Sequence, residues 1–356
     1  MSFLNNTKKW SLSLLILTLT TLLLVGVCTV VIDPFFHYHK PLEALEYPLD
    51  DERYQNNGIL KHFDYDAIIT GTSMVQNTKV SECNDLFGVN AVKTCINGTS
   101  LKEISTQLQR GLDANPNIRL VIRGIDGWSL FGDQDSTEID EKLPTYLYDN
   151  KIFNDVSYLL NKTVFLQDTL RVLQYTLSGN TTTSFDDYAK WDHLFTFDAE
   201  SVLSQYERPM KFDFVTPLSE ADAASVANCV YEHAVKVAEA YPEIQFYYFL
   251  TPYSVLLMDQ VNQYGILQRQ MDAYKVATQV FLQADNVRLF AFFDDYDTIT
   301  NLNNYFDPAH HTPEVNSHIL QSMATGEHEL TLENYEAYWD QISDFYSSFD
   351  YVSLFS

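Results

Sequence analysis

The segment Tyr65-Asp66-Ala67-Ile68-Ile69-Thr70-Gly71-Thr72-Ser73-Met74 has the pattern of a buried strand that ends in a tight turn. Apolar and β-branched residues run into Gly-Thr-Ser, and a polar, helix-compatible segment follows, as is typical of a parallel sheet covered on both faces. Ligands of open α/β sheets bind at the carboxyl edge of the strands, where Ser73 would lie. Ser73 is therefore interpreted either as a helix N-cap or as a nucleophile, and the local pattern alone favours the cap.

Four further apolar runs have the same character and are predicted to be strands: Ala91–Ile96, Leu120–Asp126, Ile244–Leu250 and Val287–Phe292. None alternates strictly between apolar and polar residues, and helical patterns separate them. Strand–helix alternation of this kind predicts an α/β fold, a three-layer parallel sheet of about five strands with right-handed crossovers.

An uncharged apolar run, Trp10–Ile32, follows Lys8 and Lys9. Its length, a little over twenty residues, matches a bilayer core of about 30 Å. A cleaved signal peptide would have a shorter apolar region and a small-x-small cleavage site, and a lipoprotein signal would need a small residue where Val27 precedes Cys28. We therefore expect a single-pass anchor over residues 10–32 in the cell membrane. The flanking charges place residues 1–9 in the cytoplasm and the rest of the chain outside.

The remaining chain is divided into a juxtamembrane segment at 33–64, an α/β domain at 65–329 and an acidic, aromatic tail at 330–356 that is expected to pack on the domain. An insertion at 133–217 interrupts the domain just after the third predicted strand, so it would emerge at the same sheet edge as Ser73. Two interpretations of it remain open: a lid over a substrate site, and a packing subdomain or partner surface.

Composition excludes several functions. The formal net charge of −26 repels nucleic acid phosphates, and no basic stripe reverses this, so no nucleic acid partner is expected. Cys83 and Cys95 could pair in an oxidising compartment, but buried free thiols are favoured. The histidines at 37, 39, 310 and 311 lack further ligands nearby and no Gly-rich phosphate loop occurs, so neither a metal nor a cofactor is expected.

A turn far from Ser73 in the sequence favours the interpretation of Ser73 as a nucleophile. Asp307-Pro308-Ala309-His310 follows the last predicted strand and precedes a helical pattern. An Asp three residues before a His on a tight turn can hold one imidazole nitrogen while the other faces a serine. Such a turn is common by itself, but its joint occurrence with Gly-Thr-Ser after the first strand is much more specific.

With these two motifs the chain resembles the SGNH or GDSL-type hydrolases, over about residues 65–324. In that family Gly-Asp-Ser ends the first strand and Asp-x-x-His lies before the last helix. The counterparts here are Gly71-Thr72-Ser73 and Asp307-Pro308-Ala309-His310. The resemblance implies a flavodoxin-like sheet, with Ser73 as nucleophile, His310 as general base and Asp307 as its orienting partner.

The resemblance also implies an oxyanion hole made by the serine N–H, a glycine after the second strand and an asparagine after the third. Gly98 fits the glycine position, but the asparagine position is held by Asp126. An ionised carboxylate cannot donate a hydrogen bond and opposes a developing oxyanion. Three alternatives remain open: Asp126 is protonated, Asn97 or Trp128 supplies the donor, or turnover is weak.

The layout as a whole resembles a membrane-anchored bacterial branch of the family, which serves D-alanylation of lipoteichoic acid and O-acetylation of surface polysaccharides. This implies an extracytoplasmic serine acyl-ester hydrolase or O-acyltransferase. Its partners would be a cell-envelope glycan, an acyl donor and a membrane acyltransferase. The alternative is a catalytically weak SGNH-like scaffold in an envelope assembly, and Asp126 favours it.

Overall fold

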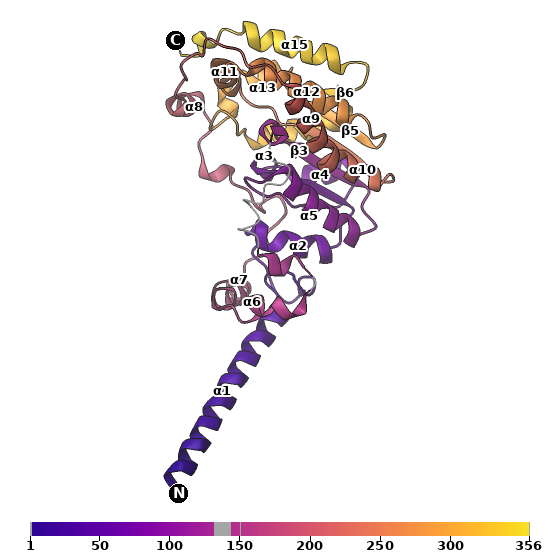
Figure 1. Cartoon of the computed structure of the whole chain (residues 1–356). Coiled ribbons are helices and arrows are strands. Elements are labelled where there is room, and N and C mark those ends of the chain that lie inside the picture. The colour runs from indigo at the N-terminus through magenta and orange to yellow at the C-terminus, as the bar shows by residue number, and fades with distance from the viewer. Residues whose placement is uncertain (1, 132–143, 150, 356) are drawn as a thin grey trace. The chain divides into compact units, whose positions relative to one another are not determined.

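The computed structural model describes residues 2–131, 144–149 and 151–355 (Figure 1). The chain forms two compact units, each built from segments far apart in the sequence. The first comprises Met1–Phe63 with Lys142–Thr183, and the second comprises Asp64–Glu141 with Ser184–Ser356. The predicted insertion is thus divided between the two units, and its predicted start at residue 133 lies outside the described residues.

The second unit contains a sheet of six strands within the described residues, in the order β2-β1-β3-β4-β5-β6. The strands are β1 (Ala67–Thr70), β2 (Ala91–Lys93), β3 (Leu120–Ile125), β4 (Gln245–Leu250), β5 (Val287–Ala291) and β6 (Glu329–Leu330). The first five are parallel, and β6 pairs antiparallel with β5 through Leu289 and Leu330. The α/β class is confirmed, and the predicted strand count of about five is corrected to six.

Helices cover both faces of this sheet. On one face, Ile69, Ile122 and Phe290 pack in a cluster with apolar residues of α4 (Val80–Phe87) and α14 (Pro313–Thr325). On the other, the buried Arg123 donates hydrogen bonds to backbone carbonyls of α5 (Leu101–Ala114) and the π-helical turn η7 (Tyr231–Val235). Coverage on both faces explains why the strands lack polar alternation.

The remaining helical elements of the second unit are α3 (Ser73–Gln76), η1 (Gly127–Phe131), η6 (Asp192–Leu194), α8 (Ala199–Gln205), α9 (Glu220–Val230), α10 (Lys236–Ala240), α11 (Val255–Gln263), α12 (Leu267–Phe281), α13 (Tyr296–Ile299), η8 (Leu302–Asn304), α15 (Tyr335–Ser348) and η9 (Tyr351–Phe355). The C-terminal tail lies on the body of this unit. Trp339 of α15 stacks on Tyr274 of α12, with ring centroids 5.0 Å apart and planes 5° from parallel. Its Nε1 donates to Thr278 Oγ1 at 2.9 Å.

Cys28, Cys83, Cys95 and Cys229, all within the described residues, form no disulfide, and Cys83 and Cys95 are buried. Burial raises the pKa of Cys83 to about 12, so this thiol is neutral at physiological pH.

The first unit consists of helices around a buried carboxylate. Its elements are α1 (Ser2–Ile32), α2 (Glu52–His62), η3 (Thr145–Leu147), η4 (Ile152–Asn154), α6 (Val156–Leu159), the π-helical turn η5 (Val164–Thr169) and α7 (Leu170–Leu177). Asp33 directly follows α1 in the left-handed region, with φ of 47°, and accepts hydrogen bonds from the backbone N–H groups of His37, Tyr38 and His39. Tyr158 of α6 donates to the same carboxylate at 2.7 Å.

The stretch Thr7–Ile32 of α1 is long and apolar enough to cross a membrane. Only 11% of its most apolar window is buried within the structure, unlike the core helix of a soluble protein. The expected apolar helix is therefore present.

Candidate active site

Ser73 is presented by a tight turn at the carboxyl end of β1. Gly71 is required there, because a Cβ at this position would lie 2.4 Å from Cγ2 of Val75 and the backbone has φ of 152°. The N-cap of α3 is Thr72, whose Oγ1 accepts from the N–H of Met74 at 3.4 Å. The cap interpretation of Ser73 is therefore wrong. The neighbouring threonine caps the helix, and the Ser73 hydroxyl contacts the His310 ring instead.

Ser73, His310 and Asp307 lie in a hydrogen-bonded row. Ser73 Oγ is 2.9 Å from His310 Nε2, and His310 Nδ1 is 2.8 Å from Oδ2 of Asp307. The other oxygen of Asp307 accepts from the backbone N–H groups of Ala309 and His310, at 2.8 and 2.7 Å. This turn fixes the carboxylate against the imidazole. The structure therefore brings the three predicted catalytic residues together; their catalytic role stays a prediction.

The carboxylate of this row is held ionised. Burial acts to raise the pKa of Asp307, but hydrogen bonds from the His310 ring and from two backbone N–H groups outweigh it and hold the pKa below its usual range. An ionised Asp307 makes Nδ1 of His310 the protonated nitrogen, which leaves Nε2 as an acceptor for the serine proton.

Aromatic side chains enclose His310. Phe306 stacks on the imidazole with ring centroids 5.2 Å apart, and Trp191 meets it edge-on at 5.5 Å. Trp191 also donates from Nε1 to the backbone carbonyl of Ser73 at 2.9 Å. Trp191 belongs to the part of the predicted insertion that lies in the second unit, and sequence reasoning missed its contact with Ser73.

Asp126 lies after β3 and is buried. Its two oxygens contact the hydroxyls of Thr72 and Thr251. Burial raises the pKa of Asp126, whereas these hydroxyls act to lower it. Thr72 and Asp126 therefore contact each other directly. This contact was not predicted.

A pocket of about 410 Å³ opens beside Ser73. All six predicted site residues except Asp307 line it, together with Thr72, Met74, Trp128, Tyr253, Leu257, Met258, Val261, Gln270, Tyr274 and Ala309. Gly98 adopts φ of 61°, a conformation that favours glycine. The pocket adjoins β1 and β3, where the strand order reverses and where ligands of open α/β sheets bind. Its size is that of a small-molecule site.

Comparisons with known proteins leave the family open. No family model matches the chain, and no curated protein matches it. Among solved structures, it is similar to a Streptococcus pneumonia protein described as a platelet activating factor, with 11% identity, a TM-score of 0.38 and coverage of 77% of this chain and 89% of the other. It is also similar to an acetyl xylan esterase from the rumen bacterium Butyrivibrio proteoclasticus, with 7% identity, a TM-score of 0.31 and coverage of 77% and 64%. TM-scores this low do not assign a function to the chain.

Proposed function

We propose that the chain is a serine acyl-ester hydrolase or O-acyltransferase of the SGNH type. The observation that carries the proposal is the row Ser73–His310–Asp307, with contacts of 2.9 and 2.8 Å between consecutive side chains. A serine within hydrogen-bond reach of a histidine that a carboxylate orients is the arrangement that activates a hydroxyl for attack on a carbonyl.

The reaction runs in two steps. Ser73 Oγ attacks the acyl carbonyl while His310 Nε2 takes the hydroxyl proton, and the leaving alcohol receives that proton as the acyl-enzyme forms. Water or a glycan hydroxyl then attacks the acyl-enzyme with His310 again as base, which returns the proton to Ser73. Asp307 holds the imidazole and stabilises its charged form in both steps.

The pocket supplies the acyl site. Leu257, Met258 and Val261 line it from one helix, α11, and the charged residue of that helix, Asp259, is not among the lining residues. We infer that this wall contacts the apolar part of the acyl group. The substrate is an acyl ester of an envelope polysaccharide or a related acyl ester, in keeping with the family resemblance.

The first unit supports a membrane location. Ile152 and Phe153 are 81% and 99% exposed, and they line an apolar groove with α1 side chains between Leu19 and Val31. Such a surface is costly in water and is covered in a bilayer. We propose a single-pass protein with its N-terminus inside, its catalytic unit outside and a membrane acyltransferase as partner. Alkaline carbonate extraction tests the anchor: the chain should remain in the membrane pellet.

A fluorophosphonate probe tests the reaction. It reacts covalently with activated serines, so we expect labelling of the full chain in detergent and loss of labelling in Ser73→Ala. The matched control is Ser204→Ala, at an exposed serine of α8, which should label as the wild type does. The wild type and Ser204→Ala should cleave short-chain esters, and Ser73→Ala should not.

The second candidate function is a catalytically weak scaffold. The observation that favours it is Asp126, which lines the same pocket as Ser73 in place of an amide donor. In either protonation state it replaces the expected asparagine, and its ionised form opposes an oxyanion. An oxyanion donor is worth about 10²–10³ in rate. Absence of labelling in a folded wild-type protein would establish the scaffold and end the enzymatic proposal.

A further inference from the structure

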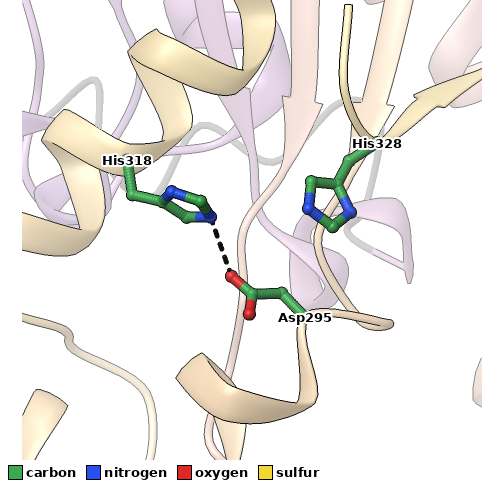
Figure 2. A group of neighbouring side chains, drawn as sticks. All are labelled: Asp295, His318 and His328. Atoms are coloured by element: carbon green, nitrogen blue, oxygen red, sulfur yellow. Dashed lines mark ion pairs between the residues drawn. The ribbon is translucent and has the colours of Figure 1, made fainter.

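Three side chains with metal-binding atoms meet beyond the carboxyl end of β5: Asp295, His318 and His328 (Figure 2). Asp295 caps α13, His318 lies on α14, and His328 directly precedes β6. One ligand atom from each lies within 4.8 Å of those of the other two. Three separate segments of the chain thus direct nitrogen and oxygen donors to one place.

His318 and Asp295 in this cluster are spaced as two metal ligands are. His318 Nε2 and Asp295 Oδ2 are 3.0 Å apart, yet Oδ2 is buried and receives no hydrogen bond from the described residues. A hydrogen bond needs an aligned N–H, so this contact is close without that alignment. Two ligands bound to one zinc ion at 2.0–2.1 Å in a tetrahedral arrangement lie roughly 3.3 Å apart, which is near the spacing observed.

Outer contacts orient two of the three ligands. His328 Nδ1 is 2.9 Å from Oδ1 of Asp294, and the ring turns its other nitrogen toward His318 and Asp295 (Figure 2). Asp295 Oδ1 accepts from the N–H of Thr298 at 3.2 Å, which leaves Oδ2 for the cluster. A carboxylate on the far nitrogen of a ligating histidine is the usual outer contact of metal sites.

We propose that Asp295, His318 and His328 bind a zinc ion. Two imidazoles and one carboxylate, with water in the fourth position, form the donor set of an open zinc site. Magnesium and calcium prefer oxygen ligands and fit this set poorly. The ion reaches the site from solvent, because the side chains of His318 and His328 are 41% and 21% exposed. The bound ion would link the turn after β5, which carries Asp295, to α14 and to the residue before β6.

Zinc titration of the full chain tests the site. The protein is purified in detergent without a histidine tag, stripped with a chelator and titrated with zinc chloride by calorimetry. We expect one zinc ion per chain and a higher thermal unfolding temperature with zinc than without it. His318→Ala and His328→Ala should each abolish this binding. Asp294→Asn alters the outer contact to His328, together with a 3.3 Å bond from the Tyr338 hydroxyl, and leaves the three ligands in place. It should weaken zinc binding about 10–100-fold.

The control is His193→Ala, because His193 lies 3.9 Å from Asp192 outside the cluster, and this variant should bind zinc as the wild type does. The proposal is overturned if the stripped wild type takes up no stoichiometric zinc, if magnesium binds as well as zinc, or if binding survives the substitution of both His318 and His328. If His328→Ala does not fold, the more exposed His318 gives the same test.

Discussion

Two adjacent histidines have opposite environments. His310 lies between Ser73 and Asp307 with both ring nitrogens in contact. His311 is fully buried, its Nδ1 lies 3.2 Å from the carbonyl of Thr312, and burial lowers its pKa to about 4. His311 is therefore neutral at physiological pH, and its Nδ1 contacts a backbone carbonyl and not a carboxylate. Of the two, only His310 is placed to take the proton of Ser73.

The burial of His311 predicts a pH-dependent stability. Its pKa of about 4 in the folded protein lies below the value near 6.5 in the unfolded chain. Between these values the unfolded state binds more protons, so stability is full above about pH 6.5 and falls as the pH drops toward 4. The loss from this one group is on the order of 3 kcal/mol. Urea unfolding at several pH values should show this loss, and His311→Gln should flatten it; equal slopes in both proteins would contradict the assignment.

Local motifs made half of the site predictable from sequence. Ser73 follows an apolar run by three residues, and Asp307 and His310 share one turn, so their roles could be inferred from short segments. The contact of Thr72 with Asp126 spans 54 positions, and that of Trp191 with Ser73 spans 118. No local pattern encodes such separations. The zinc cluster was missed for the same reason, since its ligands come from three elements without a spacing motif.

At the scale of elements, α15 supports the wall of the pocket. Tyr274 lines the pocket from α12, and Trp339 stacks on the other side of that ring. Trp339 is 1% exposed and anchored by its bond to Thr278. The C-terminal helix therefore supports the pocket wall through the Trp339–Tyr274 pair and also packs against α11, although none of its residues lines the pocket.

Trp339→Ala is expected to lower the free energy of unfolding by about 3–5 kcal/mol, because it removes a fully buried indole and leaves a cavity. Tyr274 then loses its support, so KM for an ester substrate should rise more than kcat falls. Trp339→Phe keeps a ring on Tyr274 and serves as the matched control, with a smaller change in both quantities. Urea unfolding and ester kinetics measure the two effects. A Trp339→Ala protein of unchanged stability would contradict this packing role.

Pattern recognition worked for elements that bury a regular face. The starts of β1, β3 and β5 match the predicted runs, because segments of four to six mostly apolar residues without strict alternation mark buried parallel strands. The sixth strand, Glu329–Leu330, has only two residues. It is held by pairing with β5, and two residues carry no periodicity that a sequence could reveal.

At the scale of the whole molecule, the chain alternates between its two units. The first unit takes residues up to Phe63 and returns at Lys142–Thr183, so α1 meets α6 and η5 through contacts distant in sequence. Asp33 joins these segments, because it receives three backbone N–H bonds from the turn after α1 and one hydroxyl bond from Tyr158 of α6. The buried carboxylate of Asp33 therefore ties two segments of the first unit together, and these hydrogen bonds all come from residues of that unit.

Asp33→Ala should destabilise the first unit selectively. Four donors lose their acceptor, and each buried donor left unsatisfied costs about 1–3 kcal/mol. Differential scanning calorimetry of the full chain should show two transitions, with only one moved to lower temperature in Asp33→Ala. Asp33→Asn keeps an acceptor oxygen and should shift that transition less. Fluorophosphonate labelling of Ser73 at 25 °C should be the same in all three proteins. A single transition that moves as a whole, with labelling lost alongside it, would show that the two units unfold together and that Asp33 stabilises both.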